Sequence, residues 1–133
     1  PETAGFFDGA LRSELRVQAC EGCGRLRHPP RPMCPSCHSL VRSWRRVSGL
    51  GRVWSFAVAH PPLLPGFSEL APYTVAVVEL DDDPRVRFAG GLAERVGDPP
   101  GLIDPASVQI GEPVAAAFHR VDGVGYLQWI RGR

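Results

Sequence analysis

Four cysteines in two pairs are the residues of this chain best suited to chemistry. Cys20 and Cys23 form one Cys-x-x-Cys pair, Cys34 and Cys37 form the second, and ten residues lie between the pairs. Two such pairs at this distance can bring four thiolates to the corners of one tetrahedron, which is the arrangement that a structural zinc ion requires. Because four thiolates leave no position open for water or substrate, we expect the zinc ion to stabilise the fold and to take no part in catalysis.

Three other uses of these cysteines remain open. Two disulfides would suit a secreted domain, but no signal peptide is recognisable and both pairs have the two-residue spacing of a metal knuckle. The segment from Cys34 to His38 matches the C-x-x-C-H pattern of covalent haem attachment, which would leave the first pair unused. Iron also fits a tetrahedron of four thiolates. His28 or His38 could replace a cysteine ligand, although an exposed or hydrogen-bonded imidazole is the simpler expectation for each.

Length and charge limit the classes of function. At 133 residues the chain suits one compact domain, or a small appendage with a small domain. Residues 1–52 carry nine arginines against four acidic residues and residues 53–133 carry six against ten, so the formal charges are +5 and −4. Four thiolates on Zn²⁺ would reduce the first value to about +3, which is weak for binding nucleic acid by charge alone. No apolar run approaches the roughly 20 residues that span a bilayer, and we expect a cytoplasmic protein without a membrane partner.

The N-terminal part is expected to position the cysteines. Apolar residues recur at three- and four-residue steps from Ala4 to Leu15, which predicts a short amphipathic helix that packs through Phe7, Leu11 and Leu15. A short strand over residues 16–19 leads into the first cysteine pair. The prolines within residues 25–33 exclude a helix and predict an extended connection to the second pair. These features predict a zinc ribbon over residues 16–48 and a first domain of residues 1–48.

Residues 49–133 predict a second domain made of strands and turns. Alternating or β-branched runs cover residues 53–60, 73–80, 85–92, 114–121 and 126–130. Asp122-Gly123 marks a tight hairpin between the last two runs. Five strands with these connections fit a small closed barrel of the OB type. The predicted fold is therefore mainly β, with an N-terminal helix, a rubredoxin-like zinc ribbon and a five-stranded OB-fold barrel.

The order of these motifs resembles the zinc-ribbon OB-fold family of accessory proteins. Beyond the helix, the resemblance rests on Cys20-x-x-Cys23-Gly24, Pro29-Pro30 through Cys37, Ser48-Gly49-x-Gly51-x-Val53, Pro72-Tyr73-x-Val75 and Ile110-Gly111-x-x-Val114. It covers essentially the whole chain. Within the family, the chain is similar to the C-terminal domain of the enoyl-CoA hydratase large subunit of actinobacterial steroid side-chain degradation. A chain that begins at Pro1 without an initiator methionine fits an excised domain of such a subunit, or a trimmed protein.

This resemblance implies a function and a set of partners. Members of the family accompany thiolase-superfamily enzymes that act on acyl-coenzyme A, and some are fused to a MaoC-like enoyl-CoA hydratase. The chain would then be a non-catalytic domain that binds and activates a thiolase-like aldolase for steroid side-chain retro-aldol cleavage, and that tethers it to the hydratase. The implied assembly is a hetero-oligomer built on a partner dimer, with the coenzyme A thioester at the partner interface.

The residues themselves supply no catalytic set. With the four cysteines assigned to metal, no cysteine nucleophile is left, and no serine lies in a Gly-x-Ser-x-Gly turn. His60 and His119 are the imidazoles of the barrel half, and a lone histidine near a strand end is more often structural than a general base. The proline-stiffened apolar segment that follows the first barrel strand is the candidate interface. Either it folds on its own barrel, or it contacts a partner or lines an acyl channel through His60, Leu63, Leu64 and Phe67.

A nucleic-acid-binding protein is the alternative class, because zinc ribbons and OB-folds both serve that purpose. Trp54, Phe56, Phe88 and Tyr126 could stack on bases, but aromatic residues on strands more often belong to a core. The acidic barrel half favours the accessory domain, so we expect no nucleic-acid partner. Electron transfer would require the metal to be iron.

Overall fold

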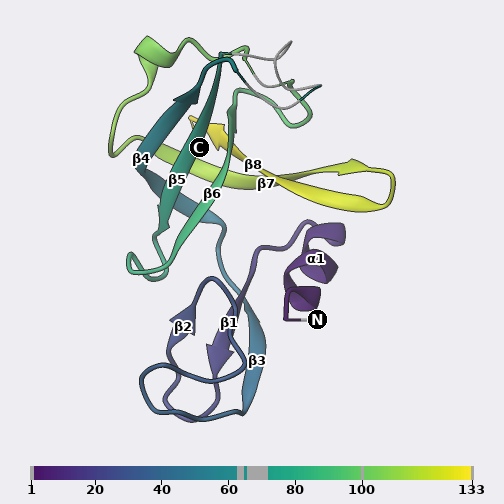
Figure 1. Ribbon diagram of the computed structural model, residues 1–133, viewed down its shortest axis with the longest axis vertical. Coiled ribbons are helices and arrows are strands. Elements are labelled where there is room, and N and C mark those ends of the chain that lie inside the picture. The colour runs from purple at the N-terminus through teal and green to yellow at the C-terminus, as the bar shows by residue number, and fades with distance from the viewer. Residues whose placement is uncertain (1, 63–64, 66–71, 100, 133) are drawn as a thin grey trace.

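The computed structural model describes residues 2–62, 65, 72–99 and 101–132. Within these residues a three-stranded ribbon sheet and one helix lie at one end, and a closed five-stranded barrel lies at the other (Figure 1). The predicted mainly β fold, with a helix, a zinc ribbon and an OB-type barrel in that order, is confirmed. In this described part, no helix combines the length and the apolar character needed to cross a bilayer.

The ribbon sheet holds the two cysteine pairs. Its strands are β1 (Arg16–Cys20), β2 (Leu26–Arg27) and β3 (Arg42–Arg46), in the order β2-β1-β3, with both neighbours antiparallel to β1. The predicted strand before the first pair is confirmed, whereas β2 lies in the segment expected to be an extended connection. That strand has two residues, because the prolines at positions 29, 30 and 32 have no amide hydrogen to donate to a longer ladder.

The barrel consists of the five predicted strands. They run in the order β4-β5-β6-β8-β7, and β7 pairs back onto β4 to close the barrel. All neighbours are antiparallel except β6 and β8, which pair in parallel over Gly91–Ala93 and Gln128–Ile130. A 3-10 turn, η2 (Pro105–Ser107), precedes β7. The strand bounds are β4 (Leu50–Ala59), β5 (Tyr73–Leu80), β6 (Arg87–Ala93), β7 (Pro113–Val121) and β8 (Val124–Arg131). A domain boundary between residues 48 and 49 stays a prediction.

One apolar core extends from the ribbon into the barrel. Trp129 is fully buried at its centre, and Leu15, Val17 and Val47 from the ribbon side belong to the same cluster. In β5 the residues at even positions from Thr74 to Leu80 are buried, and the alternate residues are half-buried on the outside of the barrel. Because ribbon and barrel share this core, removal of material from one is expected to affect the packing of the other.

Helix α1 (Ala4–Leu11) ends earlier than the periodicity predicted. Beyond it, the N–H groups of Arg12 and Glu14 both donate to the carbonyl of Gly9, and Ser13 adopts a left-handed conformation with φ of 58°. This turn ends the helix and redirects the chain into β1. Leu15 is buried in the core, but it reaches the core from the turn and not from a helical face.

The face of α1 that packs is also different from the prediction. Phe6 and Ala10 face the barrel, whereas Phe7 is 43% exposed. Ala10 packs on β8 at Gly125, where a Cβ atom would lie 2.9 Å from the Cβ of Ala10. Phe6 stacks on Phe88 with ring centroids 5.9 Å apart. The predicted face with Phe7 and Leu11 and the observed face with Phe6 and Ala10 both fit the 3.6-residue period of a helix. The observed face packs on the barrel because glycine at position 125 permits the close approach of Ala10.

Candidate metal centre and partner surface

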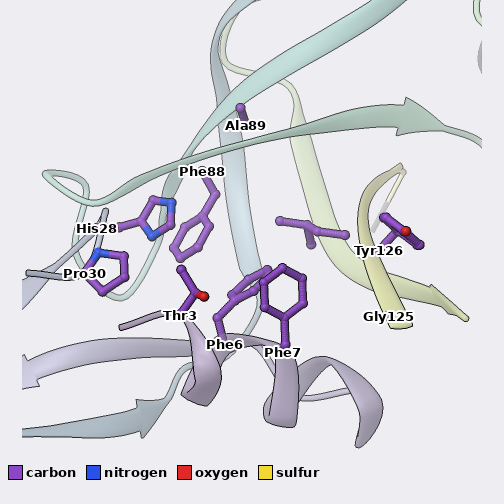
Figure 2. Close-up of a pocket in the computed structure, with 10 residues that line it drawn as sticks. Thr3, Phe6, Phe7, His28, Pro30, Phe88, Ala89, Gly125 and Tyr126 are labelled. Atoms are coloured by element: carbon purple, nitrogen blue, oxygen red, sulfur yellow. The ribbon is translucent and has the colours of Figure 1, made fainter. Parts of the chain in front are cut away.

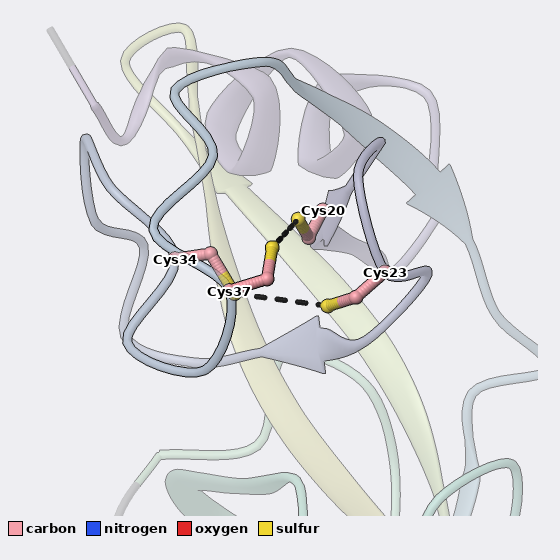
Figure 3. A group of neighbouring side chains, drawn as sticks. All are labelled: Cys20, Cys23, Cys34 and Cys37. Atoms are coloured by element: carbon pink, nitrogen blue, oxygen red, sulfur yellow. Dashed lines mark hydrogen bonds between the residues drawn. The ribbon is translucent and has the colours of Figure 1, made fainter.

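The four cysteine side chains converge at one end of the ribbon (Figure 3). Their Sγ atoms all lie within 4.8 Å of one another, with 3.5 Å between Cys20 and Cys37 and 3.8 Å between Cys23 and Cys34. A zinc–sulfur bond of about 2.3 Å places the corners of a tetrahedron about 3.8 Å apart, so these distances fit a four-thiolate metal site. They are well beyond the roughly 2.05 Å of a disulfide. The cysteines are therefore positioned to bind a metal ion.

Two similar backbone turns present these thiols. The N–H of Gly24 donates to the carbonyl of Cys20, and the N–H of His38 donates to the carbonyl of Cys34, each at 2.9 Å. The residue that ends each turn is left-handed, with φ of 77° at Gly24 and 65° at His38. His38 thus occupies the position that glycine holds in the first knuckle. Among the described residues, the clustered metal-binding group contains the four cysteines and neither His28 nor His38.

The thiols differ in acidity because their surroundings differ. The backbone N–H of Cys23, with smaller contributions from the Cys37 thiol and the Gly22 N–H, lowers the pKa of Cys20 to about 6. Backbone N–H donors of Cys37 and Ser36 lower the pKa of Cys34. The backbone of Ser39 acts in the same direction on Cys37, but the neighbouring thiols and burial outweigh it and raise that pKa to about 11. A divalent cation bound to the cluster would favour the deprotonated form of each thiol and hold all four as thiolates.

Replacing His38 with glycine is expected to raise the melting temperature by about 2–4 °C, because a left-handed backbone strains any residue with a Cβ. Metal content should not change, since the His38 side chain lies outside the thiol cluster. Differential scanning calorimetry and elemental analysis measure the two quantities. Ser36→Gly is the matched control in the same knuckle, and it should lower the melting temperature because Ser36 has no positive φ to relieve. Metal loss in the His38 variant would show that the imidazole supports the site.

A second feature lies on the barrel, on the outward side of β4, β5 and β6. We call it the outer sheet face. Register places its members in rows across the three strands, with Ala57 opposite Val75 and Val75 opposite Gly91. Beyond the row of Ser55, Val77 and Ala89, a charged row forms the edge, or rim, of this face and consists of Arg52, Glu79 and Arg87. The face itself consists of uncharged and mostly small residues: Ser55, Ala57, Ala59, Tyr73, Val75, Val77, Ala89 and Gly91.

This composition is unusual for a sheet surface that faces water, where polar residues normally alternate with the core. Trp54 adds to the apolar area at the rim, since a bulge between Val53 and Ser55 leaves its ring 47% exposed. The guanidinium of Arg87 lies 3.9 Å from the centroid of that ring. Protein interfaces are depleted in charge at their centre and enriched in Trp, Tyr and Arg, which is the pattern of the outer sheet face and its rim.

The other residues singled out in the sequence lie in different parts of the structure. His60 is exposed just after β4, while Leu63, Leu64 and Phe67 lie outside the described residues. His119 is half-buried on β7 beside Gly97, where an added Cβ would lie 3.2 Å from its Nδ1 atom. Of the four aromatic residues considered for base stacking, Phe88 is buried and Phe56 packs against the core. Trp54 and Tyr126 are exposed.

The outer sheet face was only half visible in the sequence. The sequence predicts the strand over residues 53–60, which supplies the β4 row of this face. The contribution of β5 and β6 was missed, because it depends on the register that aligns Val75 and Val77 with Gly91 and Ala89. The sequence signal for this face is the absence of a charged residue at positions 73, 75 and 77, where a strand facing water normally carries polar side chains.

The fold and the cysteine cluster together define a zinc-ribbon OB-fold protein. Two family models match the chain, "ChsH2, rubredoxin-like zinc ribbon domain" over residues 7–41 and "ChsH2, C-terminal OB-fold domain" over residues 44–119. The chain belongs to the ChsH2 family of zinc-ribbon OB-fold domains. The resemblance found in the sequence is thereby confirmed.

Curated relatives are hydratase subunits and scaffold proteins. The chain is 39% identical over 117 residues to the "3-oxo-4,17-pregnadiene-20-carboxyl-CoA hydratase alpha subunit" of Mycobacterium tuberculosis, covering 88% of this chain and 33% of that protein. It is 36% identical over 121 residues to the "Probable enoyl-CoA hydratase alpha subunit" of Thermomonospora curvata, covering 91% and 34%. The chain therefore spans about a third of the length of these hydratase subunits. A "DUF35 domain-containing scaffold protein" of Methanothermobacter thermautotrophicus is 33% identical over 111 residues, covering 83% of this chain and 75% of that protein.

A solved structure is similar over nearly the whole length of both chains. It is described as "Ltp2-ChsH2(DUF35) aldolase" and matches with a TM-score of 0.81 and 32% sequence identity, covering 98% of this chain and 94% of that chain. The likeness therefore includes the ribbon, the helix and the barrel together.

Proposed function

We propose that this chain is a non-catalytic accessory domain that binds a thiolase-superfamily aldolase acting on an acyl-coenzyme A, and that the aldolase requires it. The observation that supports this most is the match to the chain of the "Ltp2-ChsH2(DUF35) aldolase", because it covers both chains almost completely at 32% identity. The scaffold protein of Methanothermobacter thermautotrophicus supports a role in assembly. The reaction we propose is steroid side-chain retro-aldol cleavage. We also propose that the domain tethers the aldolase to a MaoC-like enoyl-CoA hydratase, which the names of the hydratase relatives support.

In this proposal the metal centre serves the fold. Cys20, Cys23, Cys34 and Cys37 would hold one Zn²⁺ ion as thiolates, and the ion would crosslink the two knuckles. Iron fits the same geometry, and zinc is our assignment. The ion joins turns that the short ribbon strands could not hold together by their own apolar contacts.

The outer sheet face is the surface that we assign to the aldolase. Its small side chains allow close approach of a partner, and its lack of charge avoids the desolvation of unpaired ions. Trp54 and Tyr73 lie at opposite ends of it and are of the type that carries a large share of binding energy. His60, Leu63, Leu64 and Phe67 remain part of the proposed interface, since their segment connects β4 to β5. We place the coenzyme A thioester at the partner interface of a cytoplasmic hetero-oligomer built on a partner dimer.

Reconstitution with the thiolase-like aldolase of the same pathway tests the proposal. The chain alone should turn over no acyl-coenzyme A, and the aldolase alone should be inactive or unstable. Together they should co-purify and cleave a carbon–carbon bond. Mass spectrometry of what co-purifies with the chain at native abundance identifies the partner without prior choice. An aldolase that works equally well alone would refute the proposal.

Measuring the affinity for nucleic acid tests the alternative class, a nucleic-acid-binding protein. With an acidic barrel half and about +3 of charge left near the metal, we expect single-stranded oligonucleotides to bind no tighter than about 10⁻⁵ M near physiological salt. The outer sheet face offers no cation in its central rows to contact a phosphate. Fluorescence anisotropy with mixed-sequence oligonucleotides measures this directly. Submicromolar binding at that salt would favour the nucleic-acid class over the accessory domain.

A further inference from the structure

A cavity of about 390 Å³ lies where three separate parts of the chain meet. Helix α1 forms one wall, the loop after β2 forms the second, and strands β6 and β8 form the third (Figure 2). Its volume is within the range of about 300–1,000 Å³ that is usual for small-molecule sites. Residues that line it are Thr3, Phe6, Phe7, His28, Pro30, Phe88, Ala89, Gly125, Tyr126 and Leu127.

Aromatic rings form the walls of this cavity. The imidazole of His28 stacks on Phe88 with centroids 3.7 Å apart and an angle of 21° between the planes. Phe6 lies against the same ring, with an angle of 20° between the planes. Phe7 stands edge-on to Phe6, and Tyr126, which is 54% exposed, lies across the cavity from His28 (Figure 2). Aromatic side chains contact other flat apolar rings by offset stacking or edge-to-face packing, so this lining suits a flat and rigid ligand.

The electrostatics of the cavity favour a neutral ligand. None of the described residues that line it is Arg, Asp or Glu. Partial desolvation lowers the pKa of His28 below its ordinary value, which favours the neutral imidazole. An anionic group placed here would lose its hydration without gaining a cation, so the phosphates of a nucleotide are disfavoured.

Three polar side chains give the cavity a limited capacity for hydrogen bonds. Thr3 and Tyr126 carry hydroxyl groups, and neutral His28 has one donor and one acceptor nitrogen. These side chains make no hydrogen bond to any other described residue. They are therefore free to bind one or two oxygen atoms on an otherwise apolar molecule.

We propose that this cavity binds the neutral, flat, fused-ring part of an apolar molecule that carries a carbonyl or hydroxyl oxygen. The biological role of the site rests on the proposed function, in which the ring system belongs to the acyl group of the aldolase substrate. Its binding chemistry rests on the cavity alone, and so it can be tested on the isolated chain.

The test is isothermal titration of the metal-loaded chain with testosterone, a neutral four-ring molecule with one carbonyl and one hydroxyl. We expect saturable binding with a dissociation constant on the order of tens of micromolar, as for drug-sized ligands of ordinary efficiency. Testosterone sulfate, with the same rings and one negative charge, should bind at least about tenfold more weakly, because the cavity offers no cation.

A space-filling variant locates the binding. Ala89 is exposed and lines the cavity, so Ala89→Trp should weaken testosterone binding at least about tenfold while the melting temperature stays close to that of the unchanged chain. Ala106→Trp is the matched control, since Ala106 is exposed on η2 and away from the cavity. It should bind testosterone normally.

Absence of saturable testosterone binding would overturn the proposal, as would equal binding by the Ala89→Trp variant. Absence of testosterone binding by an unchanged chain that still co-purifies with the aldolase would refute the ligand site and leave the proposed function intact. Normal testosterone binding by a chain that recruits no aldolase would instead refute the proposed function and support the site.

Discussion

The Cys34→Ser variant should lose the bound metal and unfold at least about 10 °C below the unchanged chain. Cys34 is buried, and its Sγ atom lies 3.8 Å from that of Cys23 on the other knuckle. A serine hydroxyl cannot serve as a thiolate ligand, so the crosslink between the knuckles would be lost. The effect should extend beyond the ribbon, because Val17 and Val47 share one core with the barrel. Calorimetry gives the melting temperature, and elemental analysis should find one zinc per unchanged chain.

Ser36→Ala is the matched control for this experiment. Ser36 is exposed in the same knuckle, and its side chain is not part of the thiol cluster. Metal content and melting temperature should therefore stay nearly unchanged. Substoichiometric metal in the unchanged chain would contradict the prediction. An iron content above that of zinc, in protein expressed without metal bias, would contradict the choice of zinc.

Placing charge on the outer sheet face should prevent assembly with the aldolase while the domain stays folded. In the double variant Ala57→Glu/Gly91→Glu both new side chains start from exposed positions in one row, and a Cβ on Gly91 meets nothing within 4 Å. The melting temperature of the isolated chain should therefore change by no more than about 3 °C. Two carboxylates buried without partners should reduce co-purified aldolase and carbon–carbon bond cleavage at least about tenfold.

Ala106→Glu adds the same chemistry at an exposed position of η2 and should leave assembly intact. Normal assembly of the double variant would exclude the outer sheet face as the docking surface. In that case the neighbouring segment with Leu63, Leu64 and Phe67 would be the next to substitute. Leu64→Asp and Phe67→Asp are the corresponding variants.

Features set by local spacing were predictable from the sequence. The two Cys-x-x-Cys pairs indicated a four-thiolate cluster, and the thiols do lie within 4.8 Å of one another. Alternation predicted β5, whose bounds of Tyr73–Leu80 match the expectation at both ends. Each of these patterns depends on a handful of consecutive residues, whose backbone geometry fixes which side chains share a face.

Features that depend on contacts between distant segments were not predictable in the same way. The helix presents Phe6 to the barrel because Gly125, more than a hundred residues later, admits Ala10. His28 rests on Phe88, so the aromatic cavity forms only when the ribbon loop meets β6. Neither contact leaves a periodic trace in the sequence, because each depends on the shape of one pair of surfaces.

The packing of Ala10 against Gly125 has a consequence for the order of events during synthesis. Helix α1 is translated before every described strand, but its binding site lies on β8, the last of these strands. Until then β6 and β7 each lack the neighbour that closes the barrel, and both present strand edges to solvent. Completion of β8 supplies both missing pairings and the binding site for α1 in one step, so α1 and β8 become ordered together.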